Sequence, residues 1–157
     1  MAQITFFKCQ LGIVKIVGDA SGISEISILD DGEVSDTIPK ELEQAVIQLQ
    51  QYFEGKRTHF DLKLNPKGTD FQRSVWQELL NIPFGKTLSY MELSKKLGDL
   101  KAIRAVAAAN GKNPLWIVIP CHRVIGTDGS LTGYAGGLWR KKWLLELENP
   151  TNQQSLF

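Results

Sequence analysis

The segment LWIVIPCHRV, residues 115–124, holds the side chains best suited to covalent chemistry. Its first five residues form a continuous apolar run that predicts a buried strand. Pro120 cannot donate a ladder hydrogen bond and should end that strand, so we expect Cys121 at a strand terminus beside His122 and Arg123. Both basic neighbours would help to stabilise a thiolate, which is the reactive form of cysteine. The segment therefore predicts a nucleophilic cysteine.

His122 is not expected to touch Cys121 directly, because adjacent residues of an extended chain point to opposite sides. We expect a bridging water to link the two side chains. A histidine base also needs an acceptor that orients its ring, and Glu146 and Glu148 near the end of the last predicted helix are the candidates. A structural cysteine beside an incidental histidine is the alternative that these residues alone leave open.

Few side chains in this chain could bind a metal. It has two cysteines, Cys9 and Cys121, and two histidines, His59 and His122, with no CxxC pair. These are too few and too scattered for a four-ligand zinc site, so we expect no metal and no other cofactor. A disulfide between the two cysteines is not expected in a reducing compartment.

The composition is that of a soluble globular protein, with 43% hydrophobic and 22% charged residues. No apolar run approaches the roughly 20 residues that span a bilayer. The N-terminal stretch MAQITFFKCQLG lacks the basic start and apolar core of a signal peptide. We therefore expect a cytoplasmic or nuclear protein with no membrane partner.

Charge is distributed unevenly along the chain, although the net charge is only +1. Residues 1–65 carry 6 Lys and Arg against 10 Asp and Glu, whereas residues 66–157 carry 12 against 7. A basic second half is typical of a phosphate-contacting face, and a solvated surface is the alternative.

The first half reads as strands followed by a helix. Apolar and β-branched runs at 4–9, 11–18 and 22–31 predict an antiparallel meander. Pro39 opens a helical pattern that Gly55 closes. The alternating segment FDLKL predicts one further strand, and the connection NPKGTD follows it. We place the domain boundary there, giving domains 1–65 and 66–157.

The second half has helical periodicity. Thr69 with Gln72 and Ser89 with Glu92 match the capping box that begins a helix. A third helical stretch, KAIRAVAAAN at 101–110, follows the second after a glycine-containing turn. Two short helices joined in this way are typical of a helix-turn-helix, and an ordinary helical hairpin is the alternative.

The alanine-rich stretch is slim and carries one long cation, Arg104, beyond Lys101. A slim helix with a projecting arginine suits insertion into a DNA groove. It suits tight helix packing equally well.

PCHRV at 120–124 resembles the active-site motif of the O6-alkylguanine-DNA alkyltransferases. The similarity continues in order through GKTLSY, KAIRAVAAAN, GKNP, IPCHRVIG and YAGGLWRKKWLLELE. The resemblance implies an α+β protein, with a small N-terminal α/β domain of ribonuclease-H-like type and a C-terminal helical domain with a winged helix-turn-helix. It implies repair of duplex DNA by a monomer, in one irreversible step after base flipping. The alkyl group leaves O6-alkylguanine, with O4-alkylthymine and larger alkyl groups as further candidates.

The resemblance also implies the catalytic residues. Cys121 would accept the alkyl group, and His122 would take the thiol proton through a water while Glu148 holds its ring. Asn113 would brace the turn and the helix-turn-helix. Tyr90 would donate a hydrogen bond to a guanine ring nitrogen and crowd the phosphate of the flipped nucleotide.

Arg104 would enter the base stack and fill the space that the extruded nucleotide leaves. The implied DNA-binding set also contains Tyr90, Ala105, Lys101 and Arg123. The implied substrate-binding set comprises Val124, Tyr134, Ala135, Gly136 and Trp116. Trp116 stands where many relatives have a small residue or proline, which favours methyl over bulky groups.

Two other classes of protein use parts of the same pattern. A Cys-His hydrolase would share the nucleophile but turn over many times. A helix-turn-helix regulator would bind DNA as a dimer without needing Cys121. Neither explains the ordered blocks that flank the cysteine motif.

Overall fold

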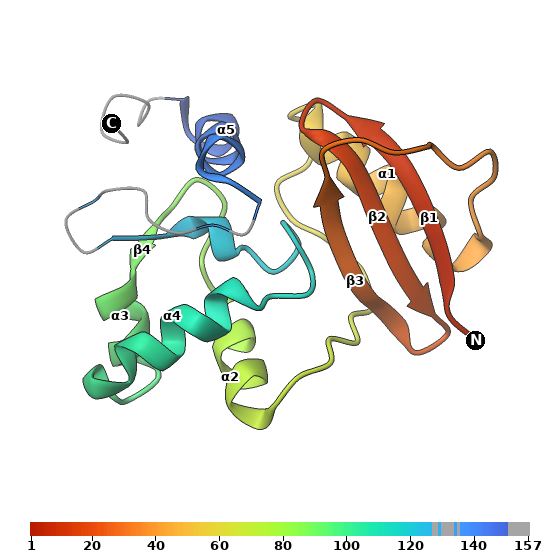
Figure 1. Ribbon diagram of the computed structural model, residues 1–157. Helices are drawn as coiled ribbons and strands as arrows, with labels where there is room; N and C mark the ends of the chain where they lie inside the picture. The colour runs from red at the N-terminus through yellow and green to blue at the C-terminus, as the bar shows by residue number, and fades with distance from the viewer. Residues whose placement is uncertain (127–128, 130–133, 135, 151–157) are drawn as a thin grey trace. The chain divides into compact units, whose positions relative to one another are not determined.

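The computed structural model describes residues 1–126, 129, 134 and 136–150 of the chain (Figure 1). It divides into two compact units. The first comprises Met1–Lys67 and Pro114–Val118, and the second comprises Gly68–Asn113 and the chain from Ile119 onward. The expected division at residue 65 did not assign the short segment Pro114–Val118 to the first unit. Among the described residues, no helix is long and apolar enough to cross a membrane.

Three strands form the sheet of the first unit, namely β1 (Gln3–Cys9), β2 (Gly12–Asp19) and β3 (Gly22–Leu29). They pair antiparallel in the order β1-β2-β3, so the predicted meander is confirmed (Figure 1). Alternate side chains of β2 are buried, as the period of a strand requires. A short helix η1 (Lys40–Leu42) and helix α1 (Glu43–Phe53) follow, and α1 buries Leu49, Tyr52 and Phe53.

Two other segments of the first unit pair with the edge of β3. Ile23 exchanges hydrogen bonds with the Lys63 carbonyl and the Asn65 amide, at 2.8 and 2.7 Å. The expected strand FDLKL is therefore wrong in extent, since only Leu64 forms a bridge to β3. Gly22, with a φ of +127°, is required there because a Cβ would lie 2.8 Å from the Lys63 carbonyl oxygen.

The run LWIVI is buried, but the predicted strand is wrong. Leu115 forms a single bridge to Ile26, and the Ile26 amide donates to the Pro114 carbonyl at 2.8 Å. The chain then turns, with Ile117 at a φ of +72°. An apolar run indicates only that its residues are buried. Here these residues are buried in a compact turn and not in an extended strand.

The second unit is built mainly from helices. They are α2 (Asp70–Leu79), α3 (Tyr90–Lys96), η2 (Leu100–Ala102), α4 (Ile103–Gly111), η3 (Cys121–Arg123) and α5 (Leu138–Glu148). Two short strands, β4 (Leu88–Ser89) and β5 (Val124–Ile125), pair in parallel. Both predicted capping boxes are confirmed, at the starts of α2 and α3. The helices α3 and α4 pack together and follow one another through η2, as the helix-turn-helix pattern predicts.

Helix α4 is anchored by α2 in the interior of this unit. The Trp76 indole N–H donates to the Ala109 carbonyl at 2.8 Å, and both residues are buried. The alanine-rich composition therefore serves close helix packing on one face of α4. Its opposite face remains exposed.

Candidate active site

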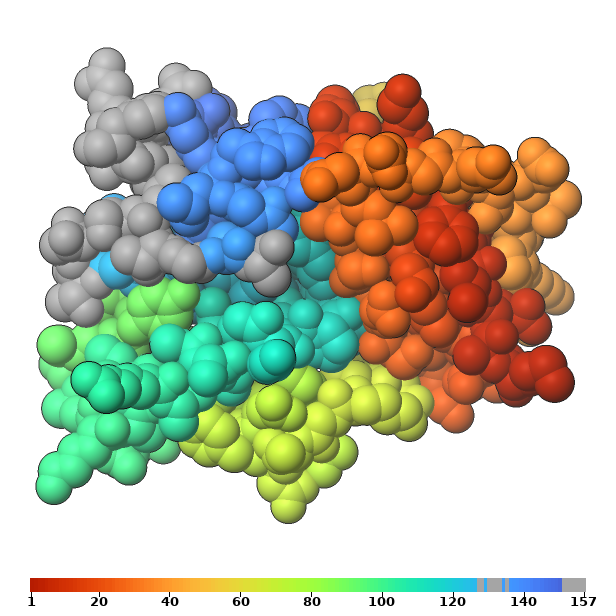
Figure 2. All heavy atoms as spheres, viewed as in Figure 1, coloured from red at the N-terminus to blue at the C-terminus, as the bar shows by residue number. Residues whose placement is uncertain are grey.

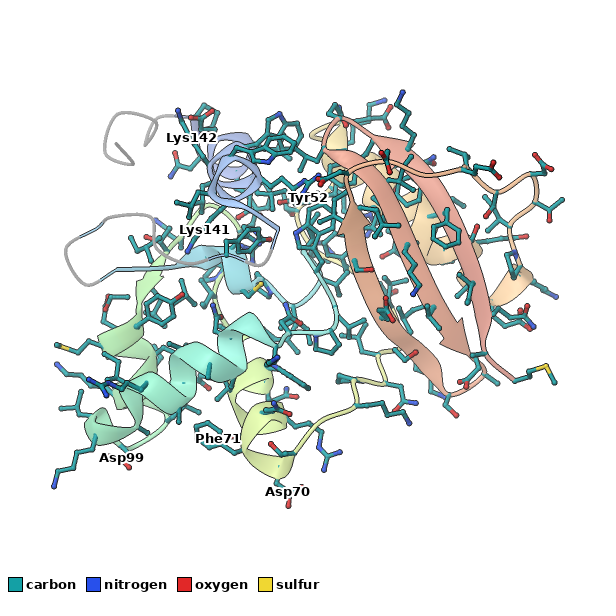
Figure 3. The ribbon with its side chains drawn as sticks, viewed as in Figure 1. Tyr52, Asp70, Phe71, Asp99, Lys141 and Lys142 are labelled. Carbon is teal, nitrogen blue, oxygen red and sulfur yellow. The ribbon has the colours of Figure 1, made fainter. Side chains whose placement is uncertain are left out.

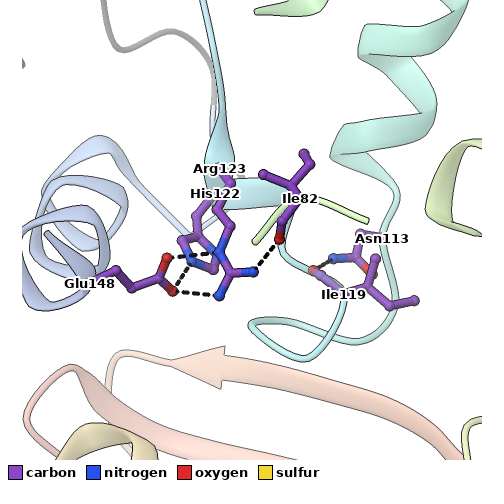
Figure 4. Close-up of polar contacts among 6 residues, drawn as sticks. All are labelled: Ile82, Asn113, Ile119, His122, Arg123 and Glu148. Carbon is purple, nitrogen blue, oxygen red and sulfur yellow. Dashed lines mark hydrogen bonds and ion pairs between the residues drawn. The ribbon is translucent and has the colours of Figure 1, made fainter. Parts of the chain in front are cut away.

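Cys121 is the first residue of η3 and lies where the LWIVI turn ends. Its amide donates to the Ile119 carbonyl at 2.8 Å, and its own carbonyl accepts from the Val124 amide. Asn113 closes the base of the turn, because its side-chain amide donates to the Ile119 carbonyl at 2.6 Å (Figure 4). The side chain of Cys121 is buried, with 7% of the residue exposed. Local backbone bonds thus hold the cysteine at one defined position.

Burial raises the pKa of the Cys121 thiol above its ordinary value. Three side chains act in the opposite direction and favour the thiolate, through a hydrogen bond from Asn113, the charge of Lys141 and a hydrogen bond from Tyr134. The expected stabilisation by His122 and Arg123 is therefore replaced by groups from other parts of the sequence. The physical reason is that His122 Nε2 and two guanidinium nitrogens of Arg123 are bound to Glu148.

His122 and Arg123 share one buried carboxylate (Figure 4). His122 Nε2 lies 2.6 Å from Glu148 Oε2, and Arg123 Nε donates to Glu148 Oε1 at 2.7 Å. A second guanidinium nitrogen, Nη2, donates to Oε2 at 3.1 Å, and Nη1 donates to the Ile82 carbonyl at 2.7 Å. Of the two candidate acceptors, Glu148 is thus the one that contacts the histidine. Glu146 instead lies 3.8 Å from Lys142.

Burial alone would raise the pKa of the Glu148 carboxyl. The charges and hydrogen bonds of His122 and Arg123 outweigh burial and hold that pKa well below its usual range. The carboxylate is therefore ionised at neutral pH and fixes the His122 ring through Nε2. The other ring nitrogen, Nδ1, is buried and has no hydrogen-bond partner among the described residues. That nitrogen is the one available to a water molecule.

Lys141 is a site residue that the sequence reasoning missed. It is fully buried on α5, and burial lowers its pKa to about 8 (Figure 3). Its Nζ lies 5.9 Å from the centre of the Tyr134 ring. Helical spacing could have indicated it, because it precedes the buried residues Leu144, Leu145 and Glu148 by three, four and seven positions.

Tyr90 and Cys121 come from distant elements and meet at Asn110, a second residue that the sequence reasoning missed. The Asn110 side-chain amide lies 3.4 Å from the Tyr90 hydroxyl and 3.5 Å from the Cys121 carbonyl. Asn110 is buried near the end of α4, and Tyr90 begins α3. The helix-turn-helix therefore contributes two residues, Tyr90 and Asn110, to the site around Cys121.

The segment of η2 and α4 presents an exposed surface (Figure 2). It carries three residues of the expected DNA-binding set, all exposed: Lys101 on η2, and Arg104 and Ala105 on α4. Arg123 is a correction, because it is buried and its guanidinium is bound to Glu148 and Ile82. A phosphate cannot reach it in this conformation.

The expected substrate-binding residues are divided between the two units. Val124 is fully buried at the start of β5, and the Gly136 carbonyl accepts from Arg140 at 2.9 Å. Trp116 belongs to the first unit, where its ring centre lies 6.1 Å from that of Phe53. Ala135 lies outside the described residues.

Comparison with known proteins agrees with this combination of a small sheet domain and a helical DNA-binding domain. Residues 3–66 match the family model for the ribonuclease-like domain of 6-O-methylguanine DNA methyltransferase. Residues 70–150 match the model for the DNA binding domain of the same protein. The chain belongs to the 6-O-methylguanine DNA methyltransferase family.

Relatives over nearly the whole chain carry the name methylated-DNA–protein-cysteine methyltransferase. The protein from Methanosarcina barkeri is 47% identical over 88% of this chain and 91% of its own length. That from Mycobacterium tuberculosis is 47% identical over 88% of this chain and 87% of its own.

Solved structures agree in fold. The crystal structure of the M. tuberculosis O6-methylguanine methyltransferase has a TM-score of 0.83 at 41% identity, covering 96% of this chain and 94% of that one. The crystal structure of the M. tuberculosis protein in complex with DNA has a TM-score of 0.84 at 42% identity, covering 98% and 94%.

Proposed function

We propose that this protein repairs duplex DNA by transferring the methyl group of O6-methylguanine to Cys121. Family membership gives the class of reaction, methyl transfer from DNA to a protein cysteine (EC 2.1.1.63). The observation that supports Cys121 as the acceptor is its position in the DNA-binding unit, where Lys141, Asn113 and Tyr134 favour its thiolate. Cys9, the other cysteine, lies in the first unit and accepts a hydrogen bond from the Leu11 amide.

His122 would remove the thiol proton through a water bound at Nδ1, while Glu148 holds the opposite side of its ring. The Cys121 sulfur then attacks the methyl carbon in line with O6. A sulfur–carbon bond forms, the O6–carbon bond breaks with its electron pair, and the released guanine gains a proton. The thioether is not hydrolysed by water, so each protein molecule accepts a single methyl group.

The methyl carbon cannot be reached while the base is stacked, so the nucleotide must leave the duplex. Arg104 would fill the space, with the exposed residues Ala105 on α4 and Lys101 on η2 as further DNA contacts. We place DNA binding and alkyl acceptance in a domain of residues 66–157, with residues 1–65 as a separate α/β domain. The protein would act as a monomer, in the compartment that holds its DNA.

The carbonyls of Cys121 and Val124 would accept hydrogen bonds from the guanine amino group. Tyr134, Ala135 and Gly136 would close over the base. Trp116, which the family resemblance implies among the substrate-binding residues, would favour methyl over bulky groups. O4-alkylthymine is a second candidate substrate.

Intact-protein mass spectrometry tests the proposal after incubation with excess duplex DNA that contains O6-methylguanine. We expect a single gain of one methylene mass, about 14 Da, in the wild type and in Cys9→Ser, and no gain in Cys121→Ser. No gain in the wild type, with the lesion intact, would leave the regulator interpretation. Loss of lesion in large molar excess over protein would indicate a turnover enzyme instead.

A further inference from the structure

Asn110 connects two groups that would face the flipped base. The family resemblance implies that Tyr90 donates to a guanine ring nitrogen, and the proposed function gives the Cys121 carbonyl to the guanine amino group. Its side-chain nitrogen lies 3.4 Å from the Tyr90 hydroxyl and 3.5 Å from the Cys121 carbonyl oxygen. The residue is 3% exposed, near the C-terminal end of α4. Both contacts are long for hydrogen bonds, as is common in active sites without substrate. No role for this residue follows from the cysteine motif or from the exposed face of α4.

The chemistry of the partners determines how the Asn110 amide is oriented. A backbone carbonyl can only accept, so the side-chain nitrogen must face Cys121. The same nitrogen then donates to the Tyr90 oxygen. A phenol has one proton and can both donate and accept, so a Tyr90 oxygen that accepts from Asn110 keeps its proton for another acceptor. Asn110 therefore makes Tyr90 a donor toward the substrate.

The remaining polar atom of Asn110 argues against a purely structural role. Its Oδ1 is buried and has no hydrogen-bond partner among the described residues. A buried acceptor without a donor destabilises the folded state, and an apolar side chain of similar size would avoid that cost. Asparagine at this position is therefore poorly explained by packing.

We infer that Asn110 is a positioning residue for methyl transfer, which directs the Tyr90 proton toward the guanine and steadies the Cys121 carbonyl. The inference rests on the proposed function of Cys121 and on the role that the family resemblance implies for Tyr90. Of the guanine ring nitrogens, N3 lies between the amino group and the sugar. A tyrosine that also crowds the phosphate of the flipped nucleotide would reach N3. N3 is therefore the acceptor toward which Asn110 orients the Tyr90 hydroxyl.

The test compares two substrates in single-turnover experiments with saturating duplex DNA. One carries O6-methylguanine, and the other carries 3-deaza-O6-methylguanine, in which a C–H replaces N3 and cannot accept. We expect the wild type to react about tenfold more slowly with the 3-deaza substrate, as for the loss of one hydrogen bond. Asn110→Leu should be about tenfold slower with O6-methylguanine and should no longer distinguish the two substrates.

Ser94→Ala is the matched control. The Ser94 hydroxyl is buried and donates to the Tyr90 backbone carbonyl at 2.9 Å, so this change disturbs the anchoring of Tyr90 without touching its hydroxyl. Ser94→Ala should keep the wild-type ratio between the transfer rates with the two substrates. Thermal unfolding of Asn110→Leu should occur at the wild-type temperature or above, which a structural role would not allow.

Two results would overturn the inference: a wild-type rate in Asn110→Leu, or a slow rate with the substrate ratio unchanged. Asn110→Met, with a flexible side chain, replaces the leucine variant if the latter does not fold. Absence of methyl transfer to the wild-type protein from either substrate would overturn the proposed function and this inference with it. A wild type that transfers equally well from both substrates would overturn the inference alone.

Discussion

The side chains of Lys141 and Cys121 each favour the charged form of the other, although both are buried. Burial raises the pKa of the Cys121 thiol and lowers the pKa of Lys141 to about 8, and the charge of each group opposes the shift of its partner. The lysine is thus still mainly protonated at neutral pH. It supplies the positive charge that a buried thiolate needs.

Replacement of Lys141 by methionine should raise the pKa of the Cys121 thiol. Alkylation by iodoacetamide at neutral pH should slow about tenfold for each unit of that rise, because the thiolate is the reacting form. Lys142→Met is the matched control, since Lys142 is partly exposed and lies 3.8 Å from Glu146. Equal rates in the two variants would show that Lys141 does not act on the thiol.

Lys141 should also make stability depend on alkaline pH. Its pKa is about 8 in the folded protein against 10.5 ordinarily, so the unfolded chain binds more protons between these values. The free energy of unfolding should therefore rise with pH from about 8 to about 10.5 relative to that of Lys141→Met. Urea unfolding across this range measures the difference, and parallel curves for the two proteins would contradict the prediction.

Loss of the Glu148 charge should destabilise the second unit. Glu148→Gln leaves the buried groups of His122 and Arg123 without their shared carboxylate, which should cost about 3–5 kcal/mol in urea unfolding at neutral pH. Glu146→Gln, which removes only a partly exposed pair, should cost less than about 1 kcal/mol.

The same carboxylate should govern acid stability. Because the pKa of Glu148 is lowered on folding, its contribution is present above its ordinary value of 4.5 and is lost as pH falls below that. The difference in stability between the wild type and Glu148→Gln should therefore shrink on acidification. A difference that stays constant down to acid pH would show that the carboxylate is not the cause.

Replacing Arg104 should slow methyl transfer without changing stability, whereas replacing Arg123 should lower stability. Arg104→Ala should slow methyl transfer from duplex DNA by at least about tenfold, since flipping a base costs a few kcal/mol. Its thiol should still react normally with iodoacetamide, because Arg104 is exposed on α4. Arg123→Ala should instead unfold more readily, since it breaks the buried pair with Glu148. Lys8→Ala, an exposed change in the first unit, controls for net charge.

Local patterns in the sequence determined several secondary-structure elements of this protein and its family. The β1-β2-β3 meander and the two capping boxes depend on neighbouring residues, whose spacing can be read directly. The PCHRV motif and its flanking blocks indicated the family, which the comparisons confirm. The acceptor of the His122 ring could be narrowed to two glutamates, because both stand near the end of the last helix.

Only the tertiary structure decided which groups surround the cysteine. Arg123 is buried and bound to Glu148, 25 residues later, and Asn110 contacts the Cys121 carbonyl from the end of another helix. The LWIVI run is buried as a turn against β3 rather than as a strand. In each case the outcome depends on pairing and burial between residues far apart in sequence. Apolar periodicity predicts that a residue is buried, and the partner that it meets is set by the packed fold.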